Sequence, residues 1–172
     1  MNPMQKTRLA KVTLNIGAGK DQTKLEKGIY LIKSITGIDP VKTITQKRIP
    51  SWGVRPGLPI GCKLTLRKEK AKEILKRLLV AKDNTLKLNN IDSCGNVSFG
   101  IEEYIDIPDV PYDPKIGVLG LQVCITLEKP GFRIKHRKVR GKKISKKHSV
   151  KQEDAVHFLE DEFEVKIEGE KT

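Results

Sequence analysis

Apolar and polar side chains alternate with a period of two along four stretches of the chain, and such alternation predicts half-buried β-strands. The stretches are residues 8–17, 60–67, 96–102 and 121–128. In the first, Val12, Leu14 and Ile16 share one face, and the residues between them are polar. Two shorter strands are expected at 42–47 and 163–167. Each long strand therefore offers one face to a core and the other to solvent or a ligand.

Three other stretches repeat apolar residues every three or four positions, which predicts amphipathic helices at 22–36, 68–80 and 151–162. Gly37 is a suitable C-terminal stop for the first helix. Helices can cover only an apolar surface, so we expect an α+β fold, a largely antiparallel β-sheet with helices packed on one face and a polar face left open. The length of 172 residues predicts a single domain over 1–172.

The polar positions of the strands define the open face of the expected sheet. Amides, hydroxyls and cations dominate these positions, and acids are scarce. The expected members are Lys11, Thr13, Asn15, Lys63, Thr65, Arg67, Asn96, Ser98, Gln122 and Thr126. Such groups can form many hydrogen bonds with phosphate and ribose oxygens, whereas an ordinary solvated face usually mixes both signs of charge. The make-up of this face therefore favours contact with RNA.

Residues 49–59 separate two of the expected strands and contain three prolines and two glycines. Proline lacks an amide hydrogen, so this stretch can be neither a helix nor a central strand. We expect a stiff, extended and protruding hairpin loop. It carries Trp52, the sole tryptophan, beside Arg55. Stacking of Trp52 on a base or ribose is one interpretation, and packing onto the protein's own domain is the other; the sequence leaves both open.

The net charge of +13 attracts polyanions, with nucleic acid favoured over anionic membranes. The apolar runs are far shorter than the ~20 residues that span a bilayer. The charge is also segregated: residues 42–82 hold twelve Lys or Arg and two acids, 129–151 hold eleven and no acid, and 153–172 hold eight acids and two lysines. A charge excess that served only solubility would not be divided in this way. The basic segment 129–151 is expected to order against phosphates, with a nuclear-import or heparin-like patch as the alternative.

No motif indicates an enzyme, a metal site or a cofactor. Cys62, Cys94 and Cys124 form no CxxC pair, and no histidine lies at metal-ligand spacing. Cys62 and Cys124 are expected to be small core residues in apolar strands, and reduced thiols together with the lack of an apolar N-terminal signal fit a cytosolic protein. The GAGK motif at 17–20 lacks the full phosphate-loop pattern, so we interpret it as a turn into a helix.

Four stretches together resemble the family of large-subunit ribosomal protein five, the universal 5S rRNA-binding ribosomal proteins. They are VTLNIGAG (12–19), ITQKRIPSWGVRPGLPIGCKLTLR (44–67), GNVSFGIEEYIDIPDVPYDP (95–114) and GLQVCITL (120–127). The short N-terminus and the basic segment resemble the archaeal and eukaryotic form more than the bacterial one. The resemblance implies a non-enzymatic, cytoplasmic constituent of the large ribosomal subunit, placed in the central protuberance, with no cofactor and no membrane contact.

The resemblance also implies binding residues and partners. 5S rRNA would contact Lys11, Thr13, Asn15, Thr45, Gln46, Lys47, Arg48, Lys63, Thr65 and Arg67. Peptidyl-site tRNA would contact the hairpin loop at Ser51, Trp52, Gly53, Val54, Arg55, Pro56, Gly57 and Leu58. The basic segment, which has no bacterial counterpart, is assigned to other, 23S-type rRNA through Arg133, Lys135, Arg137, Lys138, Arg140, Lys142 and Lys143.

Further implied partners are other central-protuberance proteins and a protein in the head of the small subunit, with which an intersubunit bridge would form. Two rival functions remain open at this point. One is a ribosome-assembly or translation factor that binds rRNA transiently. The other is a phosphate-handling enzyme that uses the GAGK motif, for which nucleotide binding would depend on Lys20.

Overall fold

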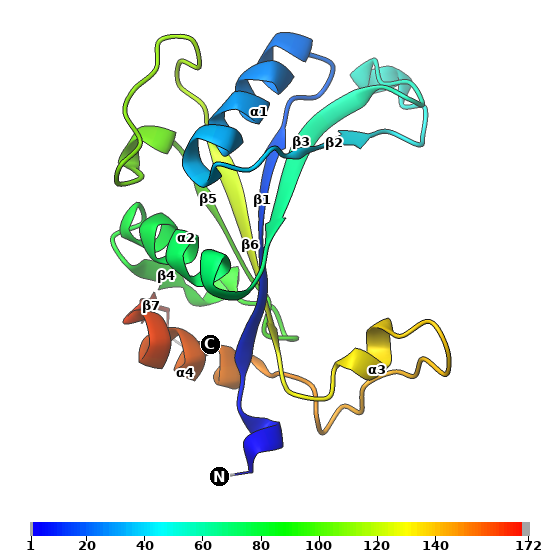
Figure 1. Ribbon diagram of the computed structural model, residues 1–172, viewed down its shortest axis with the longest axis vertical. Coiled ribbons are helices and arrows are strands. Elements are labelled where there is room, and N and C mark those ends of the chain that lie inside the picture. The colour runs from blue at the N-terminus through cyan, green and yellow to red at the C-terminus, as the bar shows by residue number, and fades with distance from the viewer. Residues whose placement is uncertain (1, 170–172) are drawn as a thin grey trace.

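The structure, a computed structural model, describes residues 2–169. A five-stranded antiparallel sheet carries its main helices on one side, and two arms project from it (Figure 1). The longer elements are β1 (Arg8–Gly17), α1 (Gln22–Thr36), β2 (Val41–Ile44), β3 (Pro59–Leu66), α2 (Lys68–Val80), β5 (Val97–Ile101), β6 (Leu121–Glu128) and α4 (Gln152–Phe163). The shorter elements are β4 (Thr85–Lys87), α3 (Arg133–His136), β7 (Lys166–Glu168) and 3-10 turns at Pro3–Gln5, Pro50–Trp52, Leu88–Asn90 and Tyr104–Asp106. The predicted α+β class is confirmed.

The strand order in the main sheet is β2-β3-β1-β6-β5, which makes β1 the central strand. β1 pairs in antiparallel fashion with both β3 and β6. Opposite residues in a sheet point to the same side, and Leu14 pairs with Leu64 on β3 and with Val123 on β6. All three side chains are buried. The alternation along β1 thus continues across the sheet and separates an apolar face from a polar one.

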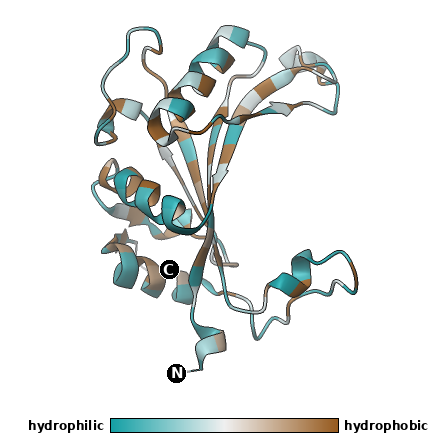
Figure 2. Cartoon of the chain, viewed as in Figure 1, coloured by the Kyte–Doolittle hydropathy of each residue, from teal (hydrophilic) through white to brown (hydrophobic). Residues whose placement is uncertain are grey.

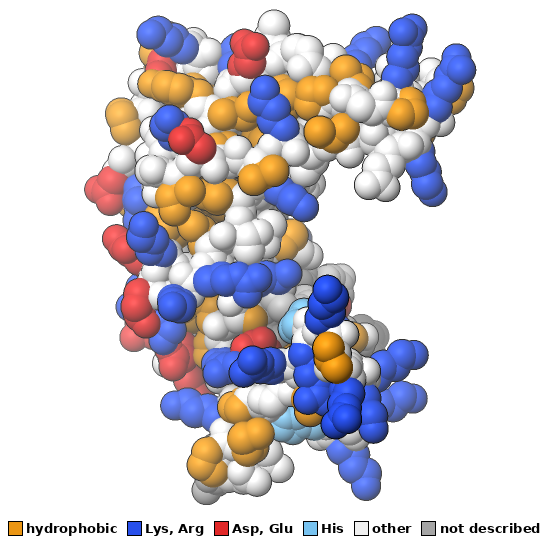
Figure 3. Space-filling view, turned by 45° about the vertical axis from the view of Figure 1, so that its right-hand side comes forward, with side chains coloured by type: hydrophobic (Ala, Val, Ile, Leu, Met, Phe, Trp, Pro, Cys, Tyr) orange, Lys and Arg blue, Asp and Glu red, His pale blue; other side chains and the backbone are white. Residues whose placement is uncertain are grey.

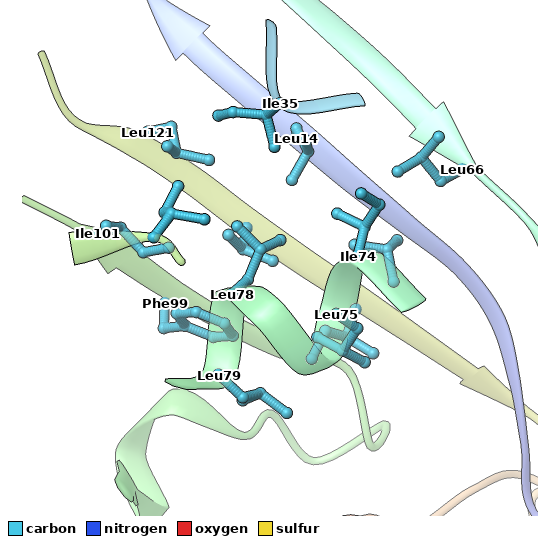
Figure 4. Packing of buried hydrophobic residues seen from close by; sticks show 14 of the residues in the cluster. Leu14, Ile35, Leu66, Ile74, Leu75, Leu78, Leu79, Phe99, Ile101 and Leu121 are labelled. Atoms are coloured by element: carbon cyan, nitrogen blue, oxygen red, sulfur yellow. The ribbon is translucent and has the colours of Figure 1, made fainter. Parts of the chain in front are cut away.

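Helices α1 and α2 cover the apolar face of the sheet and hold the core. Leu75 and Leu78 of α2 lie in one buried cluster with Leu14 and Leu121 of the strands (Figure 4), and the apolar stripes of the helices face the sheet (Figure 2). Complete burial of one such leucine contributes about 1.5–3 kcal/mol. Gly28 lets α1 pack closely against β1, because a Cβ at this position would lie only 3.1 Å from Cγ2 of Ile16 on that strand.

The GAGK stretch forms the turn that leads from β1 into α1, as predicted. The amides of Ala18 and Gly19 both donate to the carbonyl of Ile60, at 2.9 and 3.0 Å. The Asp21 carboxylate caps the helix, and its hydrogen bonds from the Thr23 hydroxyl and then the Lys24 amide lower the pKa of Asp21. The Ala18 and Gly19 amides are therefore committed inside the protein, which removes donors that a phosphate loop would need.

Two predicted strands differ from the structure. The strand expected at 42–47 ends at Ile44, where a register shift begins the hairpin turn. The strand expected at 163–167 begins only at Lys166, because Phe163 completes α4 with a buried side chain. β7 then pairs in parallel with β4, a strand that we did not expect. Strands of three residues are too short to show an alternating pattern, and their parallel partners lie far apart in the sequence.

Candidate nucleic-acid interface

The open face of the sheet presents rows of short polar side chains across several strands. Thr65, Thr13, Cys124 and Ser98 stand opposite one another in successive strands β3, β1, β6 and β5. Their side chains are short, so a nucleic-acid backbone can approach the sheet closely. Each hydroxyl can both donate and accept a hydrogen bond, which suits phosphate oxygens as well as ribose 2′-hydroxyls.

The next row of the open face carries amides and a cation. Asn15 lies between Lys63 on β3 and Gln122 on β6. The Asn15 side-chain amide donates to Oε1 of Gln122 at 3.0 Å, which fixes the orientation of both amide groups. Acids are scarce around this row, because Glu128 is the sole acid among the described strand residues on this face. Glu128 is itself paired with Arg8, with 2.6 Å between Oε1 and Nη2.

Cys124 belongs to this open face, so the prediction that it is a core residue is wrong. Its neighbours Val123 and Ile125 are buried, and the two-residue period of the strand therefore turns Cys124 outward, where it is exposed. The prediction for Cys62 is confirmed: the side chain is fully buried, and this burial raises the pKa of its thiol to about 11. Cys62 is consequently protonated at neutral pH, whereas the thiols of Cys94 and Cys124 are exposed.

The residues predicted to contact 5S rRNA fall into two groups. Those of β1 and β3 and the residue following β3 share the open face: Lys11, Thr13, Asn15, Lys63, Thr65 and Arg67. The stretch 45–48 lies beyond β2 on the projecting hairpin instead. Gln46, Lys47 and Arg48 are exposed there, but the Thr45 hydroxyl is buried without a hydrogen-bond partner in the described part of the chain. The structure thus brings together six of the ten predicted residues and places the other four on an arm.

The tip of the hairpin is more compact than the extended loop that we expected. Ile49 and Val54 exchange two backbone hydrogen bonds of 3.0 and 3.1 Å around a 3-10 turn. Gly53, with φ of 66°, ends that turn. Proline at the start of the turn supplies the φ value that the turn requires, so proline shapes it rather than extending it.

Most side chains predicted to contact tRNA are exposed at this tip, with two exceptions. Val54 is 4% exposed and Leu58 is half-buried, so neither side chain is free to reach a ligand fully. Trp52 is 70% exposed. Of the two interpretations left open for Trp52, packing onto its own domain is therefore wrong, and its ring is free to stack on a partner.

The basic arm, residues 129–151, leaves the end of β6 and returns to α4 on the same side of the sheet as the hairpin (Figure 1). All of its predicted RNA-binding residues are exposed: Arg133, Lys135, Arg137, Lys138, Arg140, Lys142 and Lys143. In Figure 3, lysine and arginine side chains crowd over this arm and stand out along the hairpin, and the surface is hollowed between the two. Acidic side chains gather along the opposite edge of the molecule.

A cleft of about 1000 Å³ separates the basic arm from the adjacent end of the open face. Its lining combines residues from two sets that the sequence analysis assigned to different RNAs, the 5S rRNA set on the sheet and the 23S-type rRNA set on the arm. The cations are Arg8, Lys11 and Arg67 from the sheet side and Arg133, Lys135, Lys142 and Lys143 from the arm, together with His136. Sequence reasoning missed Arg8 and Cys94 as lining residues, because nothing in a linear pattern shows that the arm folds back over the sheet.

The neck of the basic arm, where its two ends meet, is fixed by polar contacts that are partly buried. Lys129 is 8% exposed, and its Nζ donates to Oδ2 of Asp154 at 2.6 Å. Asp154 also accepts a hydrogen bond from the Lys151 amide at 3.0 Å. Burial alone would raise the pKa of Asp154, but the hydrogen bonds from Lys129 and Lys151 and their charges lower it overall. His148 adds a contact of 2.7 Å between Nε2 and the Pro130 carbonyl, in which the ring N–H is the donor.

A second hollow, of about 830 Å³, differs in its charge. It is lined by residues of both signs: Lys24, Lys82 and Lys87 with Asp83, Glu102 and Glu168. Such a lining does not select a polyanion. Among residues 2–169, no group of three or more His, Cys, Asp or Glu side chains is arranged to hold a metal ion. No helix in that range is long and apolar enough to cross a membrane.

Comparison with known proteins identifies the family of the chain. Residues 2–55 match the family model "Ribosomal protein L5", and residues 59–158 match the model for the C-terminus of the same family. The large ribosomal subunit protein uL5 of Sulfurisphaera tokodaii is 46% identical over 97% of this chain and 95% of its own length. The uL5 proteins of Nanoarchaeum equitans and Methanosphaera stadtmanae are 45% and 44% identical, over 96% and 98% of this chain and 98% and 100% of their own lengths. The chain therefore belongs to the ribosomal protein L5 family.

Proposed function

We propose that this protein, a structural and non-enzymatic constituent of the large subunit of cytoplasmic ribosomes, binds 5S rRNA through the open face of its sheet. The observation that carries this proposal is the row of Thr65, Thr13, Cys124 and Ser98 beside the row of Lys63, Asn15 and Gln122. The main helices α1 and α2 lie on the opposite face of the sheet, and the one acidic strand residue on this surface, Glu128, is neutralised by Arg8 within the described part of the sheet. The choice of 5S rRNA as the ligand comes from the resemblance to 5S rRNA-binding ribosomal proteins.

Recognition through this face would depend on RNA shape. A sheet with short side chains matches the wide and shallow minor groove of an A-form helix, where 2′-hydroxyls and base edges are displayed. The hydroxyls of Thr13, Thr65 and Ser98 suit the 2′-hydroxyls, and Lys63 and Arg67 suit the flanking phosphates. The fixed amides of Asn15 and Gln122 would add a few orientation-dependent hydrogen bonds.

The finer contacts of the proposal belong to other surfaces. The hairpin tip would contact peptidyl-site tRNA through Trp52 and Arg55, which are both exposed. The outer cations of the basic arm, Arg137, Lys138 and Arg140, would anchor the protein to 23S-type rRNA, because they do not line the cleft. Other central-protuberance proteins and a protein of the small-subunit head, in an intersubunit bridge, complete the proposed set of partners.

A gel-shift comparison of 5S rRNA with tRNA and with a random RNA of equal length tests the main proposal. Thr65→Ala combined with Arg67→Ala should weaken 5S binding at least ~10-fold, since both side chains point away from the core. The control is Lys70→Ala with Lys76→Ala, which removes two exposed cations, one more than the test variant, from α2 on the covered side of the sheet. Normal binding by the first variant, or equal affinity of the wild type for all three RNAs, would refute the proposal.

Sedimentation separates a structural constituent from a transient factor. After a high-salt wash, a constituent remains stoichiometric with the large subunit, whereas a transient assembly or translation factor is released. Loss of the protein from washed subunits would therefore favour the rival function.

A further inference from the structure

The cleft between the open face and the basic arm has cations on both of its walls, and the one acid among its described lining residues, Glu128, is paired with Arg8. Lys11 and Arg67 stand on the sheet wall, and Arg133, Lys142 and Lys143 stand on the arm wall. Cations that face each other across a cleft repel, so this arrangement is unfavourable when the cleft holds only water. A ligand with negative charge on both of its sides would remove that repulsion. A phosphodiester backbone, with regularly spaced phosphates, has this chemistry.

The neck holds the arm at the distance that leaves the cleft open. The Lys129–Asp154 pair and the contact between His148 and the Pro130 carbonyl close the two ends of the arm on each other. Val150, also at the neck, is 2% exposed and packs against Gly95. These contacts involve neither Lys142 nor Lys143, so the arm cations remain available to a ligand.

We infer that the basic arm and the open face grip the same RNA strand from two sides, and that Asp154 is a positioning residue that holds the arm in place for this contact. The inference rests on the proposed function, since it takes the RNA on the open face to be 5S rRNA. It changes the role of the arm: Arg133, Lys135, Lys142 and Lys143 serve the RNA bound by the sheet, and the outer cations alone remain for other rRNA.

The protein contains natural reporters for this arrangement. Cys124 stands in the middle of the open face, and Cys94 lines the cleft. Both thiols are exposed, and Cys62 is an internal control because it is buried and the pKa of its thiol is about 11. Alkylation of the full chain with a maleimide, followed by mass spectrometry, measures the reactivity of each thiol with and without 5S rRNA.

The inference predicts that 5S rRNA slows alkylation of both Cys124 and Cys94. Protection of Cys124 alone would overturn the inference and leave the proposed function standing, because the sheet would then hold RNA without the arm. Protection of Cys94 alone, or of neither thiol, would overturn both, since the open face would not be the binding surface. The failure of each claim is thus distinguishable.

Binding measurements across a range of salt concentrations test the arm directly. Lys142→Ala with Lys143→Ala should weaken 5S binding and lower the slope of log K against log salt by roughly 1.4–1.8, at about 0.7–0.9 per lost phosphate contact. Lys70→Ala with Lys76→Ala carries the same charge change on α2 and should leave the slope unchanged. An unchanged slope in the arm variant would overturn the inference.

Asp154→Asn tests the positioning role by the sign of its effect. Removal of an acid from a protein that binds a polyanion should strengthen binding if only the overall charge matters. We expect weaker binding and a smaller salt slope, because asparagine can still accept the Lys151 amide but no longer pairs with the Lys129 charge. Asp154→Glu should restore part of the affinity. Stronger binding by Asp154→Asn, with helix content unchanged by circular dichroism, would overturn the positioning role.

Discussion

The two arms that project from the sheet are held in different ways. The hairpin extends the pairing of its strands: the Thr45 amide donates to the Leu58 carbonyl at 3.0 Å, and farther out Ile49 and Val54 exchange two more bonds. The basic arm contains only the four-residue helix α3 as regular structure and is fixed mainly where its ends meet. The hairpin is thus held along its length by successive backbone hydrogen bonds, whereas the basic arm is a loop held mainly by contacts at its neck.

This difference teaches where each arm is vulnerable. The hairpin loses its shape only when several of its backbone hydrogen bonds break, because each bond is supported by its neighbours. A loop that depends on a few contacts at its neck can be released by one substitution there, while the rest of the fold stays intact. We therefore expect substitutions at the neck to affect the basic arm strongly, and comparable substitutions in the hairpin to have smaller effects.

The largest effect is expected from Gly95→Ala. Gly95 has φ of +72°, and a Cβ there would lie 2.5 Å from Cγ1 of Val150 at the neck. Backbone strain and the displaced valine together should cost about 2–4 kcal/mol of the free energy of unfolding, measured by urea denaturation. Limited proteolysis should show faster cleavage within the basic arm.

Gly57→Ala in the hairpin is the matched control for Gly95→Ala. Gly57 also has a positive φ, +85°, but a Cβ there would meet nothing within 4 Å. Only the backbone cost of about 1 kcal/mol is then expected. Equal losses in the two variants would show that the neck packing adds nothing and would break the distinction between the arms.

A smaller effect is expected from Asp154→Asn on stability. The side chain of Lys129 is 10% exposed and that of Asp154 is 34% exposed, so the pair is partly shielded from water. Its loss should cost about 1–2 kcal/mol of the free energy of unfolding. Asp39→Asn removes an ion pair of similar length, 2.8 Å to Lys33, in which both side chains are more than half exposed. That control should cost no more than about 0.5 kcal/mol.

The contribution of Asp154 should also depend on pH. Its pKa is lower in the folded protein than in the unfolded chain, where an aspartate titrates near ~3.9. The stabilisation is therefore fully present above the unfolded pKa and is lost as the pH falls through the folded pKa. The difference in melting temperature between wild type and Asp154→Asn should be constant from neutral pH down to about 5 and should shrink below about 4. A difference that grows in acid would contradict the ion-pair assignment.

The sequence predicted the sheet well because its strands are long and amphipathic. Alternation over β1 and β3 assigned Thr13, Asn15, Lys63 and Thr65 to the open face correctly. The same rule, applied to β6, would have placed Cys124 outside; the error came from treating the residue as apolar and ignoring its position in the period. The position of a residue in the two-residue period of a strand therefore predicts its face better than the polarity of its side chain.

The cleft could not be predicted, for a different reason. It depends on the neck, and the neck joins Lys129 to Asp154 across 25 residues in a segment without hydrophobic periodicity. The run of cations in 129–151 showed that the segment attracts phosphates but not which surface it faces. Local patterns specify elements, whereas the direction of an irregular arm is decided by a few long-range polar contacts.

The smallest effect on stability is expected at the hairpin tip. Trp52→Ala with Arg55→Ala removes two exposed side chains whose neighbours Ile49 and Val54 keep their backbone bonds. The free energy of unfolding should change by no more than about 0.5 kcal/mol, and affinity for 5S rRNA should match that of the wild type. Chemical footprinting of ribosomes carrying this variant should nevertheless show weaker protection of peptidyl-site tRNA, because stacking and charge at the tip are lost. Weakened 5S binding with intact tRNA protection would reverse the roles proposed for the sheet and the hairpin.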